Sequence, residues 1–343
     1  MKKVKLFLII IIIVIIAIMV LLYVEKKNEL QMIQPLRIGY QSQGITSGPI
    51  MVAYDKGFFN KAGLQVEMIP LKSGNEIRQA IALNRIDVAF TTPTNVFMVA
   101  AIGAPVKIIA HSASVEYILY VRPDGEIKTF SDLKGKKIFG GGVGNSEVVL
   151  TFALNKEGIK STDFEFVDAE KDYRELALVQ HKIIDVIPCS RYNKGFLEKA
   201  GAIPHQEWEE KGYGDELWPI SVVAVNTDYL KENNQLIESF LNVLIEAQEY
   251  ITMNKNESAE LIAKHINTMT GNVKKFSAKE IQDVWQDGVE YVLWYEQDKL
   301  IDMSKFVVDT GMIETKIPLE TIFDLTFEEK LKFAQDKIYG SKN

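Results

Sequence analysis

The residues of this chain best suited to chemistry are neutral hydrogen-bonding side chains that follow apolar, strand-like runs. Tyr40-Gln41-Ser42, Thr91 to Asn95 and His111-Ser112 each come directly after such a run. One segment of this kind is equally explained by turns and caps, because serine, threonine and asparagine cap helices in any case. Three segments in equivalent places favour a site that holds a small ligand through hydrogen bonds. The neutral candidates are Tyr40, Gln41, Ser42, Thr91, Thr92, Thr94, Asn95, Ser112, Asn145 and Ser146.

Two predicted helix starts add backbone donors to this set. One lies near Ser47, just ahead of Pro49, and the other lies near Ser146, after the glycine-rich turn from Gly140 to Gly144. A helix start carries N–H groups without helical partners and the positive end of the helix dipole. Glycines let the backbone approach a ligand closely. Ser47 and Gly144 therefore join the candidates, although the turn lacks the Gly-Lys-Ser/Thr ending of a phosphate-binding loop.

The charged and aromatic candidates are fewer. Arg191 can clamp an anionic group with two donors, although a surface arginine is an equal alternative. A multiply charged ligand would need more fixed charge than this set supplies. We therefore predict a ligand with one compact anionic group, a sulfonate or carboxylate, with Glu147 and Asp168 available for an amine at its other end. The alternative is a pyrimidine whose exocyclic amine these acids read, stacked on Tyr40 or Trp218.

Composition is ordinary for a folded protein and excludes some classes of partner. The 343 residues are 47% hydrophobic and 25% charged, and the net charge of −7, with no basic stripe beyond the extreme N-terminus, argues against nucleic acid. The single cysteine, Cys189, cannot form a disulfide within the chain. The four histidines are scattered without metal-ligand spacing, so we predict no metal, no cofactor and no catalytic residues. They are His111, His181, His205 and His265.

The chain repeats itself once. Asn60-Lys61-Ala62-Gly63-Leu64 recurs 95 residues later (60 to 155) as Asn155-Lys156-Glu157-Gly158-Ile159, and Ile86-Asp87-Val88 recurs 98 residues later (86 to 184) as Ile184-Asp185-Val186. A repeat this long is not a solenoid unit. It predicts two similar α/β lobes, each of which aims a helix start at a shared space.

The N-terminal segment has the pattern of a membrane anchor. Residues 1–5 carry three lysines, and residues 6–24 are uncharged and almost wholly apolar. A helix of this length, at about 1.5 Å per residue, nearly spans a hydrocarbon core of about 30 Å. Because no small-residue cleavage site follows, we predict an uncleaved anchor that leaves residues 1–5 in the cytoplasm and the folded part outside. Cleavage, giving a secreted or periplasmic protein, is the alternative, and residues 25–35 are a tether in either case.

Strand-like runs alternate with helical ones along the folded part. This order predicts a mostly parallel sheet covered on both faces, with ligands beyond the carboxyl ends of its strands. We divide the chain into a discontinuous first lobe, residues 36–121 plus 220–343, and a second lobe, residues 122–219. Crossings near Val121 and Ile220 join the two Rossmann-like lobes. Strands are predicted at residues 36–40, 64–69, 86–90, 106–110, 137–139, 165–168, 183–188 and 218–225.

Several motifs resemble the solute-binding proteins of ABC importers. They are Asp55-Lys56-Gly57-Phe58-Phe59, Ala62 to Glu67, Ile86 to Ala89, Ser131 to Ile138, and Thr310 to Ile313 with Ile322-Phe323-Asp324. The branch they resemble most serves nitrate, sulfonates, taurine and thiamine-pyrimidine precursors. The resemblance covers about residues 36 to 325 and implies the type II periplasmic-binding-protein fold. It also implies a monomer that works at the cytoplasmic membrane with an ABC permease and its ATPase.

Two departures and two alternatives accompany the resemblance. Many bacterial members carry a lipid-bearing cysteine or a cleaved signal, which this chain does not show, and a usual glycine is replaced by Arg85. A pyrimidine-synthesising branch of similar fold relies on a histidine and a cysteine-rich motif. The single cysteine and the scattered histidines of this chain argue against that alternative. A membrane-tethered ligand sensor with the same trap is the other alternative.

Overall fold

The computed structural model describes residue 19 and residues 35–340, apart from 43, 142, 168–177, 180–181, 192–193, 271–274, 295–296 and 317. The predicted basic stub lies outside the described residues. So do the predicted anchor, except for Met19, and the predicted tether, except for residue 35. Within the described part, no helix is both long and apolar enough to cross a membrane. The anchor therefore stays a prediction.

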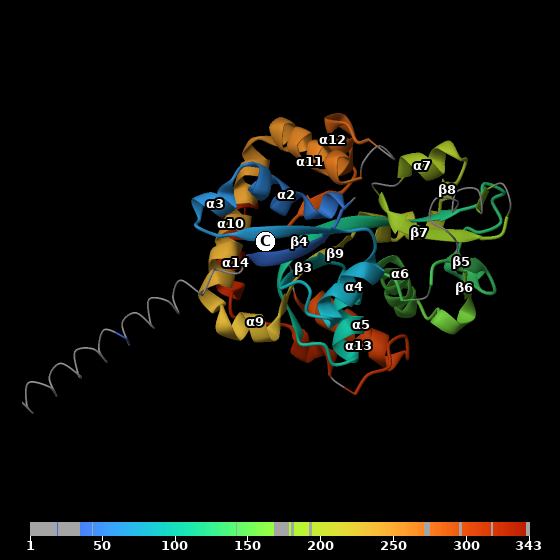
Figure 1. The fold of residues 1–343 in the computed structure, drawn as a ribbon. Coiled ribbons are helices and arrows are strands. Elements are labelled where there is room, and N and C mark those ends of the chain that lie inside the picture. The colour runs from blue at the N-terminus through green and yellow to red at the C-terminus, as the bar shows by residue number, and fades with distance from the viewer. Residues whose placement is uncertain are drawn as a thin grey trace, which may run out of the picture.

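One group of strands, which we call the first half-sheet, forms one end of the molecule (Figure 1). Strand β1 lies between β2 and β3 and runs parallel to both, while β9 pairs antiparallel with β3 on one side and with β4 on the other. The short strand β10 pairs with β4. The bounds are β1 Leu36–Gln41, β2 Val66–Leu71, β3 Val88–Thr91, β4 Val106–Val121, β9 Leu217–Asn226 and β10 Val289–Tyr291.

The second half-sheet, at the other end of the molecule in Figure 1, repeats the same three-strand core. Strand β5 lies between β6 and β7 and is parallel to both, as β1 is to β2 and β3. Strands β7 and β8 pair antiparallel with the last part of β4. The bounds are β5 Lys137–Phe139, β6 Glu165–Val167, β7 Val186–Ser190 and β8 Ile203–Pro204.

A single long strand, β4, belongs to both half-sheets. It pairs with β9 as far as Glu116 and with β7 from Tyr117 onward. All its residues except Lys107 and Glu116 are buried, so a continuous apolar run becomes a strand covered on both faces. The change of partner comes before the predicted boundary at residue 121, and the division into two lobes stays a prediction.

The sequence predicted a mostly parallel sheet, and this prediction is wrong, because parallel and antiparallel pairs occur together. Strand β9 returns from the second half and inserts antiparallel between β3 and β4, and β4 meets β7 antiparallel. The apolar pattern of a buried strand is the same whichever way it runs. The pattern alone could therefore not give the direction of β9.

The repeated Ile-Asp-Val motif has one structural role in both halves. The backbone N–H of Arg37 donates to Asp87 Oδ2 at 2.9 Å, and that of Lys137 donates to Asp185 Oδ2 at 2.8 Å. In return, the N–H of each aspartate donates to the carbonyl of its partner. Each aspartate thus fastens the first strand of its half to the third, just before the latter begins.

Helices cover both half-sheets. In the first half, Phe59 stacks on Phe240 at a ring distance of 6.1 Å, which joins two covering helices. The helices of this half are α2 Gly48–Asp55, α3 Phe58–Lys61, α4 Gly74–Ala82, α5 Pro93–Ala101, α9 Thr227–Glu232, α10 Asn234–Met253, α11 Lys255–Thr270, α12 Ala278–Gln286, α13 Gln297–Asp309 and α14 Glu328–Tyr339. Those of the second half are α6 Asn145–Lys156, α7 Lys194–Lys199 and α8 Gln206–Glu210.

The helix caps agree with the sequence in part. The capping box of Ser277 and Glu280 forms at the start of α12. The spacing of Thr326 and Glu329 predicts a second capping box, but this prediction is wrong, because Thr326 donates its hydroxyl proton to Asp324 at 2.6 Å and α14 has no side-chain cap. The pair Thr227-Asp228 predicts the cap of one long helix, but the structure has Asn226 as the cap and an interruption at Asn233 between α9 and α10.

Candidate ligand-binding cleft

A cavity of about 320 Å³ lies where the two half-sheets meet. The last residues of four parallel strands line it: Gln41 of β1, Thr91 of β3, Phe139 of β5 and Ser190 of β7. Ligands of open α/β sheets sit beyond the carboxyl ends of the strands, and this cavity has such ends on two sides. We call it the cleft.

The cleft brings together nine of the residues picked out from the sequence. It does not include six others, and Asp168 lies outside the described residues. The nine are Gln41, Ser47, Thr91, Thr92, Asn95, Gly144, Asn145, Ser146 and Glu147, and the six are Tyr40, Ser42, Thr94, Ser112, Arg191 and Trp218.

Two of the excluded neutral residues, Tyr40 and Ser112, are bonded to the surrounding structure. The hydroxyl of Tyr40 is 2.9 Å from His265 Nε2, and burial raises the pKa of Tyr40 to about 12. Ser112 donates its hydroxyl proton to the carbonyl of Thr46 at 3.0 Å. Tyr40 lies next to Gln41 on one strand, and neighbouring side chains of a strand point to opposite faces. This explains why Gln41 lines the cleft and Tyr40 does not.

Arg191 is held away from the cleft by carboxylates. Its guanidinium is 2.5 Å from Glu116, 3.6 Å from Glu209 and 3.5 Å from Asp215, and it donates to the carbonyl of Gly214. The predicted clamp on an anionic ligand does not fit this position, because the guanidinium is paired with carboxylates of the protein itself.

Trp218 is fully buried and cannot reach a ligand in the cleft. Phe152 packs edge-to-face against it at 6.0 Å, and Lys299 Nζ lies 4.0 Å from its ring centre. The stacking partners expected for a pyrimidine, Tyr40 and Trp218, are therefore both outside the cleft. The aromatic rings that line it are Phe90, Tyr117 and Phe139.

The wall contributed by the first half, which we call the first wall, consists of neutral groups that hydrogen-bond to one another. Thr92 caps α5 by accepting from the N–H of Asn95, and Asn95 Nδ2 donates to Thr91 Oγ1 at 2.9 Å. Arg78 donates to Asn95 Oδ1 at 2.6 Å, and burial lowers the pKa of its guanidinium. A positive charge thus stands directly behind this wall.

The wall contributed by the second half, the second wall, is built around Glu147. This side chain is 7% exposed, and its carboxylate accepts from the N–H of Gly141 at 3.1 Å and from the hydroxyl of Ser146 at 3.0 Å. It lies in the first turn of α6, where the helix dipole favours a negative charge. Among the described residues that line the cleft, Glu147 is the one charged side chain.

The glycine-rich turn makes room for this carboxylate. A Cβ atom at Gly140 or at Gly144 would overlap the carboxylate oxygens of Glu147, and Gly140 has a φ of 142° that L residues rarely adopt. The sequence suggested that the turn brings the backbone close to a ligand. In the structure, two of its glycines receive a side chain of the protein itself.

Asn145, the first residue of α6, has one polar atom without a partner. Its Nδ2 donates to the carbonyl of Pro219 at 2.9 Å and lies 3.1 Å from the hydroxyl of Tyr117. Its Oδ1 is buried and accepts no hydrogen bond, and the residue is 8% exposed. A buried acceptor left in this state is uncommon in native proteins.

Ten further residues line the cleft and were not picked out from the sequence. For two of them a signal was present, because the offset of 98 residues relates Thr91 and Thr92 to Cys189 and Ser190 (91 to 189). Ser221 carries no such signal, since it lies inside the apolar strand β9. The ten are Gly44, Thr46, Phe90, Tyr117, Phe139, Pro188, Cys189, Ser190, Ile220 and Ser221.

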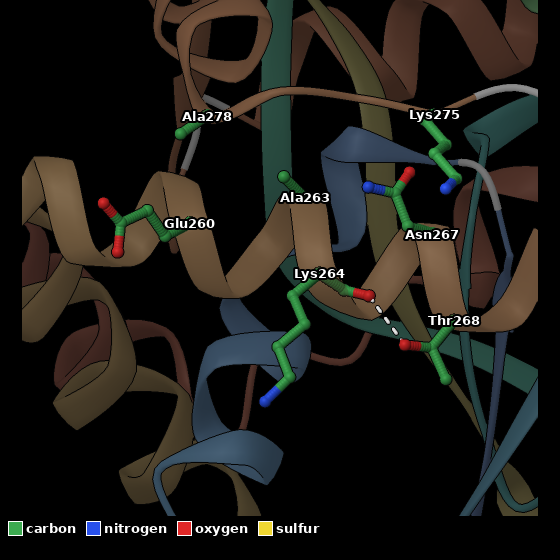
Figure 2. Close-up of a pocket in the computed structure, with 7 residues that line it drawn as sticks. All are labelled: Glu260, Ala263, Lys264, Asn267, Thr268, Lys275 and Ala278. Atoms are coloured by element: carbon green, nitrogen blue, oxygen red, sulfur yellow. Dashed lines mark hydrogen bonds between the residues drawn. The ribbon is translucent and has the colours of Figure 1, made fainter.

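A second hollow, of about 530 Å³, lies between α11 and the residues before α12 (Figure 2). Its lining includes Glu260, Lys264 and Lys275, which are exposed. Thr268 donates back to the carbonyl of Lys264, and Asn267 is bonded to the backbone of Phe276. Because Thr268 and Asn267 bond the protein's own backbone and none of the described strands ends at this hollow, the cleft is the better candidate.

Comparison with known proteins identifies the family. The model of a family described as "NMT1/THI5 like" matches residues 45–258, which is more than half of the chain. The chain belongs to the NMT1/THI5-like family. This confirms the resemblance seen in the sequence, and the matched residues include most of the cleft.

Individual relatives of this NMT1/THI5-like protein are distant. A Brucella abortus protein named "Putative binding protein" is 24% identical over 270 residues, 74% of this chain and 81% of that protein. A 4-amino-5-hydroxymethyl-2-methylpyrimidine phosphate synthase of Saccharomyces cerevisiae is 28% identical over 215 residues, 59% of this chain and 62% of that protein. The aliphatic sulphonate binding protein of Escherichia coli matches with a TM-score of 0.67 at 18% identity, over 84% of this chain and 91% of that chain. The fold is thus the mixed α/β fold of periplasmic binding proteins.

Proposed function

We propose that this protein is the extracytoplasmic solute-binding subunit of an ABC importer. It closes two lobes on a small solute, such as a sulfonate or a nitrate-like anion, and delivers the solute to the permease. The observation that carries the proposal is the cleft, because strand ends from two similar half-sheets face one cavity. Its volume lies at the low end of the range of about 300–1,000 Å³ that is typical of small-molecule sites.

Binding without catalysis fits the lining of the cleft better than a synthase does. Among the described residues, no histidine lines it: His265 contacts Tyr40, His205 caps α8, and His111 is buried elsewhere. The yeast relative is named as an enzyme, so enzyme activity is the competing class. A tethered sensor would use the same cleft. What distinguishes an importer subunit from such a sensor is that it works with a permease and an ATPase.

A heterocycle related to thiamine-pyrimidine precursors is the second candidate solute. The specific observation in its favour is Glu147, whose carboxylate can accept hydrogen bonds from an exocyclic amine. Phe90, Tyr117 and Phe139 offer ring surfaces in place of the stacking partners that we expected from the sequence.

The proposed location is the outer face of the cytoplasmic membrane, with residues 6–24 as an uncleaved single-pass anchor and the binding protein as a monomer. Mass spectrometry of membrane-extracted protein tests the anchor, since the N-terminal segment should still be present. A mature N-terminus after Val24 would instead make the protein secreted or periplasmic.

A thermal-shift screen of nitrate, sulfonates and pyrimidine precursors tests the function. A solute at about 100 times its Kd adds about 2.7 kcal/mol to stability, which gives a clear rise in melting temperature. X-ray scattering should then show a more compact particle with the solute, because only the closed form contacts it from both sides. Identical curves for the free protein and for the protein with a solute of proven affinity would exclude lobe closure.

A further inference from the structure

We propose that the second wall of the cleft binds an N–H donor group of the solute and not its anionic end. The donor group is an aliphatic ammonium or an aromatic amino group. This inference rests on the proposed function and adds a substrate class to it. The acceptors are Asn145 Oδ1 and the carboxylate of Glu147. Both residues belong to the first turn of α6, and both are lining residues of the cleft.

The orientation of the Asn145 amide leaves an acceptor and not a donor without a partner. Exchanging its oxygen and nitrogen would bring Oδ1 against the carbonyl oxygen of Pro219, which cannot donate. The nitrogen must therefore face Pro219, and Oδ1 is the atom that a solute can satisfy. Because burying this oxygen unpaired costs free energy, a solute with an N–H group regains that cost on binding.

Glu147 fills the place where an anionic solute would otherwise bind. A glycine turn followed by a helix start is a general anion site, but here the carboxylate of Glu147 already lies against Gly140 and Gly144 and accepts from Gly141. A sulfonate at this end would meet a buried carboxylate at close range, and like charges in a poorly solvated site repel strongly. An ammonium or amino group would meet it favourably.

The opposite wall fixes which way the solute lies. Asn95 and Thr91 are held by one another, and Arg78 stands behind them with a positive charge. The cleft is therefore polarised from Arg78 to Glu147. A solute with an acceptor or anionic end and a donor end is placed with its acceptor end toward the first wall and its N–H group toward α6.

The test uses two matched pairs of probes that exchange an amino group for a methyl group of similar size. Taurine and propane-1-sulfonate form the aliphatic pair, and 4-aminopyrimidine and 4-methylpyrimidine form the aromatic pair. Calorimetry on the wild-type protein should show the amino member of at least one pair binding at least about tenfold more tightly, since hydrogen bonds to charged groups are the strong ones. The pair that shows the preference tells an aliphatic ammonium from an aromatic amine.

Glu147→Gln should shrink that preference to less than about threefold, because the amide keeps the shape but loses the charge. The matched control is Glu320→Gln, the same change at an exposed carboxylate away from the cleft, which should leave the preference unchanged. If Glu147→Gln lowers the melting temperature so far that binding cannot be measured, the wild-type preferences alone decide.

The two proposals fail in different ways. Equal or tighter binding of the methyl members, or binding of nitrate and propane-1-sulfonate alone, overturns the inference and leaves solute binding intact. If none of the four probes and no anion of the screen binds, the proposed function falls together with the inference.

Discussion

The two halves of the molecule present equivalent helix starts that are used differently. Helix α2 follows β1, and α6 follows β5, and residues of both starts line the cleft. The start of α2 has Ser47 at its cap, makes no side-chain cap hydrogen bond and has no acid in its first turn. The start of α6 has Gly144 at its cap and is covered by its own Glu147.

This difference separates what the repeat preserves from what it leaves free. The repeat preserves the strand order and the aspartate that joins the first and third strands of each half. It does not preserve the residues at the helix starts. If the cleft is the binding site, as we propose, the repeated scaffold would fix where a solute lies, and a few side chains at its turns would decide which end of the solute each half accepts.

The largest expected effect comes from the preserved aspartates. Asp87→Ala should lower the free energy of unfolding by about 2–3 kcal/mol, because the carboxylate accepts from the backbone and from the guanidinium of Arg37. Asp185→Ala should cost less, about 1–2 kcal/mol, since its side chain is 17% exposed against 5% for Asp87. Urea unfolding measures both, with exposed Asp228→Ala as the control. Equal losses in the two variants would contradict the unequal burial.

The second prediction compares the two turns that precede the helix starts. Gly140→Ala should cost about 1–3 kcal/mol in all, through its backbone conformation and through the overlap with Glu147. Gly44→Ala should change stability by less than about 1 kcal/mol. Gly44 has a φ of −84°, and a Cβ atom there would come no closer than 3.1 Å to a neighbouring atom, the carbonyl oxygen of Gln41. In a double-mutant cycle, Gly140→Ala should cost less when Glu147→Ala is also present. Additive effects would show that the turn is not shaped around this carboxylate.

The sequence predicted positions better than orientations. Helix starts and strand ends follow from local patterns, so nine cleft residues, including Thr91 and Asn145, could be found without a structure. The direction of β9 and the commitment of Arg191 to Glu116 depend on contacts between distant segments. Local periodicity holds no information about such contacts. The role of Gly140 and Gly144 was missed for the same reason, because a flexible turn looks alike whether a ligand or a side chain fills it.

The third prediction tests both walls with a bound aminosulfonate, whose two ends reach the two walls. Thr92→Val and Ser146→Ala should each weaken binding by about 1–3 kcal/mol, which is the cost of an unpaired buried group. The hydroxyl of Thr92 also caps α5, and that of Ser146 donates to Glu147, so melting temperatures of the free variants are needed beside the calorimetry. Unchanged affinity in both variants would show that the cleft is not the binding site.

The last prediction concerns two strand ends that the repeat relates, Thr91 and Cys189. Cys189 is the one cysteine of the chain, is 4% exposed and lines the cleft. A solute that occupies the cleft should slow the reaction of its thiol with a neutral alkylating reagent. At a solute concentration about ten times the Kd, the rate should fall on the order of tenfold, because only the free fraction reacts.

The matched variant moves the thiol to the other half by combining Cys189→Ser with Thr91→Cys. If the two walls enclose one site, the solute should protect the moved thiol to the same degree. Protection at one position only would show that the solute contacts a single half. In that case the two strand ends would share an ancestry in the repeat but not a function.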